Sequence, residues 1–262
     1  MMQNIIPQVP SHFTKVFYIP KHNENVSNFA VYDISEQYSD KIGKLPMGSE
    51  DYKVELCILP KPNGEHVGDN ARFLVDVGSD NTSMSVRERT LGQDPVEAQV
   101  FRSLPKPQND EYFVHTHTGS TSARSSGRLA FPLPEKHMKK EIIRYPYLAF
   151  TDDIFSNNHA EHSQYEWQVH PDEKGALRYE LVNFEEKSSE DRDHSILAIY
   201  HHHGFENDLP TSHSHGVLLL PSTSTSEFDI SVLSSLLAIL SAVRQQARLK
   251  KRSRIRCLMG CI

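Results

Sequence analysis

The feature that most constrains this chain is an unbroken run, ISVLSSLLAILSAV, from Ile230 to Val243. All of its residues are apolar or carry a small hydroxyl, so a helix here would be apolar around nearly its whole circumference and would have to be surrounded by other structure. The run falls short of the roughly 20 residues that a helix needs to cross a bilayer, which favours a core helix over a membrane anchor. We therefore expect one buried helix from about Asp229 to Lys250.

The residues just before this run carry signals for the start of a helix. Ser224 with Glu227, or Ser226 with Asp229, has the spacing of a capping box, in which a hydroxyl and an acidic side chain satisfy the first free backbone N–H groups. Either pair predicts that the helix begins close to Asp229.

Most other apolar segments alternate with a period of two and are rich in Val, Ile, Phe and Tyr, which is typical of half-buried β-strands. YEWQVH and LRYELVNF are joined by PDEKGA, whose Asp and Gly favour a turn, so this pair predicts a hairpin. The Ser- and Gly-rich stretch 118–127 is expected to be a mobile loop. About a dozen strands are expected, starting near Phe13, Asn28, Lys53, Ala71, Glu97, Glu111, Arg128, Tyr145, Tyr165, Leu177, Ser195 and His215.

The segments YEWQVHPDEKGALRYELVNF, SILAIY, GVLLLP and FDISVLSSLLAILSAVRQQAR follow one another in an order that resembles the tubby C-terminal-like superfamily. This superfamily includes tubby proteins, phospholipid scramblases and many fungal proteins. The resemblance implies a mainly β fold, a closed antiparallel barrel of about twelve strands around a central hydrophobic C-terminal α-helix. It covers about residues 13–250, with an N-terminal tail at 1–12 and a basic, Cys-containing tail at 251–262. A closed barrel suits such a helix because its inward side chains can coat the helix on all sides.

The charge of the chain is distributed unevenly. Its 28 Lys and Arg residues and 34 Asp and Glu residues give a formal net charge of -6. Residues 244–256 hold seven of the basic residues and no acid, which leaves 21 basic against 34 acidic residues elsewhere, or -13. Such a basic segment favours an anionic partner, and its lack of aromatic residues favours a phospholipid surface over nucleic acid. The predicted lipid-binding residues are Arg244, Arg248, Lys250, Lys251, Arg252, Arg254 and Arg256.

Two cysteines, Cys257 and Cys261, follow the basic run directly. Acylation of either would add the second signal that stable membrane anchoring requires, whereas the alternative is a frayed terminus whose cysteines do nothing. The chain shows no signal-peptide pattern at residues 1–13, and its three cysteines do not have the spacing of a disulfide framework. We expect an intracellular, cytoplasmic protein that associates peripherally with membranes.

Histidine is abundant, with 15 residues, and several are two positions apart. His201, His203, His213 and His215 flank a short polar segment, so a hairpin could gather four imidazoles, the side chains that commonly bind zinc or copper. A polar loop that has collected histidines without binding metal is the favoured reading. A metal-binding protein is therefore the alternative function.

The sequence carries no recognisable catalytic motif. It lacks a GxSxG elbow, a Walker loop, a GxGxxG motif and an HExxH motif, and Cys57 lies within an alternating strand pattern. The sequence thus predicts a binding or scaffolding protein without enzymatic activity and without a cofactor. Nucleic-acid binding through residues 244–256 is the weaker alternative.

Overall fold

The structure is a computed structural model, and it describes residues 9–23, 25–39, 71–79, 83–89, 97–102, 110–118, 121–130, 147–151, 164–171, 177–183, 196–202 and 214–259. The described part is mainly antiparallel β-structure with one long, apolar C-terminal helix, as the sequence predicts. Its elements are β1 (Lys15–His22), β2 (Asn28–Asp33), α1 (Ser35–Gln37), β3 (Ala71–Val77), β4 (Ser83–Glu88), β5 (Glu97–Arg102), β6 (Asp110–Thr118), β7 (Thr121–Ala130), β8 (Tyr147–Thr151), β9 (Gln164–Pro171), β10 (Leu177–Asn183), β11 (Ile196–His202), β12 (Ser214–Leu220) and α3 (Ser226–Met259).

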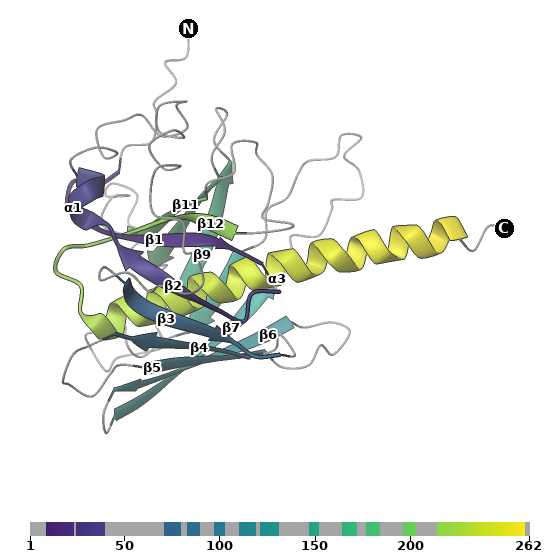
Figure 1. The fold of residues 1–262 in the computed structure, drawn as a ribbon, viewed down its shortest axis with the longest axis horizontal. Helices are drawn as coiled ribbons and strands as arrows, with labels where there is room; N and C mark the ends of the chain where they lie inside the picture. The colour runs from purple at the N-terminus through teal and green to yellow at the C-terminus, as the bar shows by residue number, and fades with distance from the viewer. Residues whose placement is uncertain are drawn as a thin grey trace, which may run out of the picture.

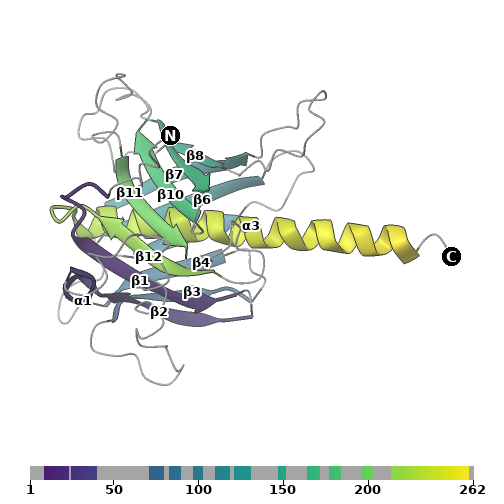
Figure 2. The same ribbon diagram turned by 90° about the horizontal axis from the view of Figure 1, so that it is seen from above.

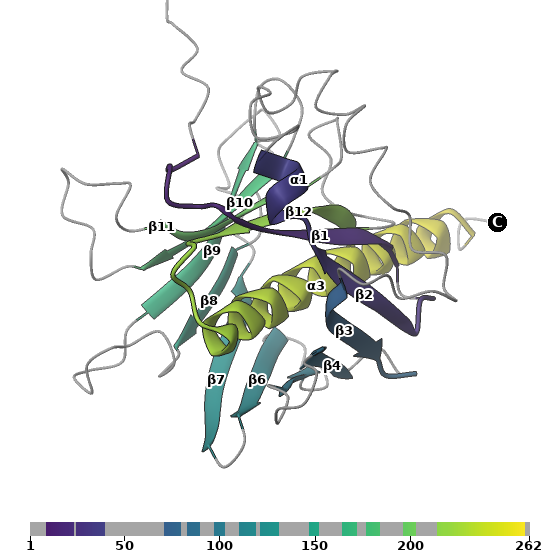
Figure 3. The same cartoon turned by 60° about the vertical axis from the view of Figure 1, so that its left-hand side comes forward.

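Each strand pairs antiparallel with the strands that precede and follow it in the chain, and β1 also pairs with β12. The order of pairings among the described strands therefore returns to its start, as β1-β12-β11-β10-β9-β8-β7-β6-β5-β4-β3-β2. The β9–β10 hairpin is confirmed, with Pro171 opposite Leu177 and Tyr165 opposite Asn183. Figures 2 and 3 show the strands lying on both sides of α3.

Two strands of the structure were not predicted from the sequence. Residues 121–130, expected to lie largely in a loop, form β7, which pairs with β6 from Thr121 to Leu129 and with β8. Residues 83–88 form β4, which the sequence analysis missed. Both segments are rich in Ser and Arg, so their composition does not indicate a strand. Neighbouring strands supply the hydrogen bonds that hold them extended. The strand expected from Lys53 lies outside the described residues.

The helix α3 supplies the centre of the main apolar core. Residues 230–240 are all buried, and Leu236 and Leu240 are fully so. They pack against inward side chains of the strands, including Phe17, Phe73 and Trp167. The indole Nε1 of Trp167 donates a hydrogen bond of 2.9 Å to the Ser235 hydroxyl, which in turn donates to the Val232 carbonyl, so the helix satisfies the polar group of the largest core side chain.

Part of α3, Ser226–Gln245, is long and apolar enough to cross a membrane by length and composition, but most of it is buried inside the protein. Burial explains its composition, because a helix enclosed by strands has no face that needs to meet water. This agrees with the expected core helix. Its bounds differ from the expectation, since α3 starts at Ser226 and continues to Met259. Residues 251–259 of the basic, Cys-containing tail are thus helical.

A second apolar cluster covers the outer face of β1, β2, β3, β11 and β12. Tyr18, Ile199 and Leu219 belong to it, and Phe13 and Val9 add to it from the segment before β1. The His12 carbonyl also accepts a hydrogen bond from the Ser222 backbone N–H at 3.1 Å. Residues 9–12, which the sequence analysis assigned to the N-terminal tail, thus contact the strand region.

Candidate functional site

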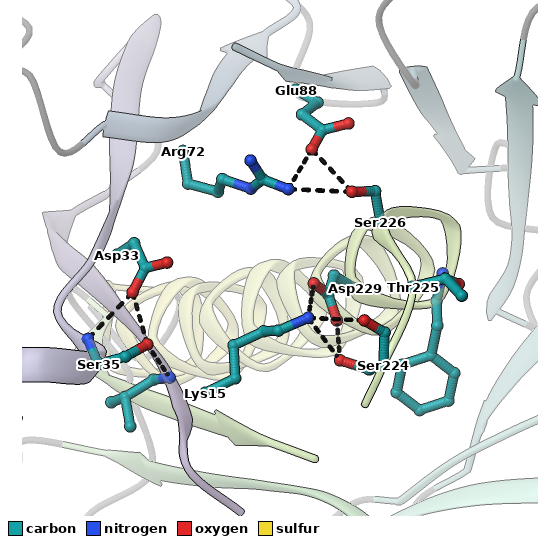
Figure 4. A network of polar contacts seen from close by, with 11 residues as sticks. Lys15, Asp33, Ser35, Arg72, Glu88, Ser224, Thr225, Ser226 and Asp229 are labelled. Carbon is teal, nitrogen blue, oxygen red and sulfur yellow. Dashed lines mark hydrogen bonds and ion pairs between the residues drawn. The ribbon is translucent and has the colours of Figure 1, made fainter. Parts of the chain in front are cut away.

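A partly buried ion pair holds the start of α3. The ammonium of Lys15, on β1, lies 2.8 Å from Oδ2 of Asp229, whose side chain is 1% exposed. The same ammonium donates to the Ser224 hydroxyl and the Ser224 carbonyl, and the Ser224 hydroxyl donates to Oδ1 of Asp229 (Figure 4). Burial raises the pKa of Asp229, and the hydrogen bonds from Lys15 and Ser224 partly counter that rise.

A second polar group lies at the same end of the helix. The guanidinium of Arg72, on β3, pairs with the carboxylate of Glu88, on β4, and also donates to the Ser226 hydroxyl at 3.0 Å. Ser226 donates to Glu88 at 2.8 Å, so one hydroxyl joins the helix to two strands (Figure 4). With Lys15 and Asp229, these contacts fix α3 to three strands at its N-terminal end.

The helix is capped differently from the sequence prediction. The hydroxyl of Thr225 accepts a hydrogen bond of 3.2 Å from the backbone N–H of Phe228, three residues on, which is the contact of an N-cap residue. Neither expected capping-box serine does this, because Ser224 and Ser226 bind Asp229 and Glu88. The long-range partners of these serines, Lys15 for Ser224 and Arg72 and Glu88 for Ser226, are not visible in a local sequence pattern.

The opposite end of the buried helix carries Arg244. Its side chain is 5% exposed, and its Nη1 donates to the Ser214 hydroxyl at the start of β12 and lies 3.4 Å from Nε2 of His22 at the end of β1. Burial lowers the pKa of Arg244 to about 10, so the guanidinium remains charged at neutral pH. Arg244 therefore does not belong to an exposed basic surface, and its assignment as a lipid-binding residue is corrected.

The C-terminal part of α3 projects away from the strands, as Figures 1 and 2 show. The other predicted lipid-binding residues, Arg248, Lys250, Lys251, Arg252, Arg254 and Arg256, and also Cys257, occupy this projecting part, which we call the basic extension, residues 246–259. Consecutive helical residues are about 100° apart, so the six basic positions are distributed around the helix and not along one stripe. Cys261 lies outside the described residues.

The proposed histidine cluster is described only in part. His203 and His213 lie outside the described residues, whereas His201 is on β11 and His215 on β12. Burial and the neighbouring Arg178 lower the pKa of His201 to about 3, and its Nε2 has no hydrogen-bond partner among the residues that the structure describes. The described part of the chain contains no group of three or more His, Cys, Asp or Glu residues that could hold a metal ion.

The sequence analysis missed the polar contacts at both ends of the buried helix. The available signal was the position of Asp229 immediately before the apolar run and of Arg244 immediately after it. A charge at either limit of a buried helix needs a partner, but Lys15, Ser214 and His22 are too distant in the chain to be paired with these residues by spacing. No family model, curated protein or solved structure matches the chain.

Proposed function

We propose that this chain is a tubby-like protein without enzymatic activity, a closed barrel of about twelve strands around α3, that binds anionic phospholipid membranes peripherally. The basic extension is the membrane-binding element. The observation that carries the proposal is the continuity of α3, which runs from the buried core into six basic residues without an intervening loop.

The physical support is electrostatic. Each Lys or Arg close to an anionic leaflet contributes about 1 kcal/mol, so six of them give reversible, salt-sensitive attachment. The rest of the chain carries an excess of acid, which an anionic leaflet repels, so contact would be confined to the basic extension. The protein would then meet the membrane through one end only.

Acylation of Cys257 or Cys261 would strengthen this attachment. Cys257 follows the last basic residue directly, and Leu258, Met259 and Ile262 lie near it in the chain. A single acyl chain gives only marginal binding, but together with a basic segment it provides stable anchoring. An intracellular location, with access to the cytoplasmic leaflet, follows from this proposal.

The test is sedimentation of the full chain with vesicles of phosphatidylcholine alone and of phosphatidylcholine with 30% phosphatidylserine, a composition in the range of anionic leaflets. The wild type is expected to sediment with the anionic vesicles only, and to be released by 0.5 M salt, which shortens the screening length to about 4–5 Å. Changing the six basic residues of the extension to Gln should abolish this binding. The matched control changes six basic residues elsewhere to Gln: Lys21, Lys136, Lys139, Lys140, Lys174 and Lys187.

Two outcomes would contradict the proposal. The first is a wild-type protein that stays in solution with anionic vesicles at low salt. The second is equal loss of binding in both Gln variants, which would show that net charge and not the extension is responsible. A parallel titration with duplex DNA of random sequence tests the other anionic partner, and tight DNA binding without vesicle binding would replace a membrane by nucleic acid as the ligand.

A further inference from the structure

Arg244 marks the exit end of α3, the point where the helix passes from the core to the basic extension. Its guanidinium contacts Ser214 on β12 and His22 on β1, two strands that pair with each other, His22 directly opposite Ser214. Three elements from distant parts of the chain therefore meet at one buried cation.

The contacts of His22 define its protonation state. Its Nδ1 lies 3.0 Å from the carbonyl oxygen of Pro20, and since that oxygen can only accept, Nδ1 must carry the proton. Its Nε2 lies 3.4 Å from Nη1 of Arg244, which can only donate, so Nε2 must present its lone pair. This geometry fits only the neutral imidazole. The Phe29 ring stacks on it with centroids 4.3 Å apart, which holds the ring in this orientation.

The other titratable groups on this side of Arg244 come from the neighbouring strands. Tyr200 on β11 and Tyr179 on β10 act electrostatically on Arg244, and His202 on β11 lies 3.4 Å from the Tyr200 hydroxyl. Burial raises the pKa of Tyr200, so it stays neutral near pH 7. The Tyr200 hydroxyl is thus a neutral neighbour of the Arg244 cation. A histidine, in contrast, is the kind of group whose charge changes between pH 5 and 8.

We propose that His22, Arg244 and Ser214 form an acid-sensitive latch on the exit end of α3. When His22 gains a proton on Nε2, it loses its capacity to accept from Arg244, and two positive charges face each other in a buried site. The exit end of the helix and the end of β1 then separate, while the start of α3 remains fixed by Lys15 and Arg72. If the basic extension binds membranes as proposed above, the latch makes the attachment of that extension to the strands dependent on pH.

The direction of the effect follows from proton linkage. The closed latch excludes the proton on Nε2 and the open latch admits it, so the closed form is favoured at higher pH and loses stability as pH falls. One proton can shift such an equilibrium by up to tenfold per pH unit, or about a hundredfold over two units. The effect is confined to the exit end.

Hydrogen exchange of the full chain without vesicles tests the latch separately from membrane binding. Exchange of the backbone amides is followed by mass spectrometry at pH 7.5 and 5.5 and corrected for intrinsic rates. Peptides covering residues 240–248 are compared with peptides covering residues 226–236. In the wild type, opening of residues 240–248 should rise about tenfold or more at the lower pH, with a smaller change at residues 226–236.

The variant His22→Gln keeps an acceptor for Arg244 but cannot be protonated, so its exit end should open equally at both pH values. The matched control is His12→Gln, which removes an exposed histidine before β1, away from the latch, and should respond as the wild type does. If His22→Gln does not fold, a titration of the His22 ring nitrogens by NMR in the wild-type protein gives the same answer. A His22 that is already protonated at pH 7.5 while residues 240–248 stay protected would overturn the proposal, as would equal pH responses of the wild type and His22→Gln.

Discussion

His201 shows how strongly a folded environment can change a residue that the sequence marks as a metal ligand. It lies on the same face of β11 as Ile199, two residues earlier and a member of the outer apolar cluster. It is opposite Arg178 on β10 and is 2% exposed. The HxH spacing was recognisable in the sequence. The burial of the His201 side chain could not be recognised there, because it depends on strands and segments that pack over β11.

The low pKa of His201 predicts an acid-dependent loss of stability. The folded-state pKa is about 3 and the ordinary value is 6.5, so the neutral form contributes stability that is fully present above pH 6.5 and is lost as pH falls toward 3. The wild type should lose up to about 1.4 kcal/mol per pH unit more than His201→Gln in that window. Urea unfolding at pH 7, 6, 5 and 4 measures the difference, and parallel curves for the two proteins would refute it.

The Lys15–Asp229 pair predicts strong coupling between a strand and the helix. Lys15→Met or Asp229→Asn leaves one buried partner without its counterpart and should cost about 1–3 kcal/mol of the free energy of unfolding. The double variant should lose less free energy of unfolding than the two single variants lose together, and this difference is a coupling energy of about 0.5–3 kcal/mol.

The Arg87–Asp76 pair provides the control, since both of its side chains are 49% exposed. A double-mutant cycle on this exposed pair should give about 0–1 kcal/mol. Equal coupling energies for the two pairs would mean that burial does not strengthen the contact at the start of α3.

At the scale of the elements, the helix was the most predictable part of the fold, because an all-apolar run of this length has few alternatives to burial. Strands with aromatic and β-branched residues, such as β9 and β10, were also predictable. β4 and β7 were not. In SMSVRE the apolar alternation is limited to Met84 and Val86, and TSARSSGRLA has no apolar alternation over most of its length. Their extended form depends on pairing with neighbours that a local pattern cannot specify.

The central position of α3 predicts that charges in it prevent folding. The variant carrying Leu236→Asp and Leu240→Asp places two charges without partners in the main core and should be unfolded by circular dichroism and thermal scans. The exposed residue Glu227, in the first turn of the same helix, supplies the control, and Glu227→Gln should melt close to the wild type. A soluble double-Asp variant with an unchanged melting temperature would contradict the core position of α3.

For the whole molecule, the boundary between core and extension lies at Arg244 and Gln245. A chain ending after Gln245 keeps all the described core contacts of α3, including those of Arg244, and loses the basic extension. It should melt within a few degrees of the full chain and should no longer sediment with anionic vesicles. A truncated chain that fails to fold would mean that residues 246–262 support the core.

The position of α3 in chain order has a consequence for biosynthesis. Every described strand precedes α3, and about 200 residues separate β1 from it. At 5–20 residues per second, β1 therefore exists for roughly 10–40 s before translation of the central helix begins, and each later strand exists for a shorter time. During this interval the side chains that later contact α3 have no native partner, which makes the nascent chain a substrate for holding chaperones and a candidate for aggregation when translation slows. The helix α3 is thus the last part of the core to be synthesised, and the strands made before it depend on it for their packing.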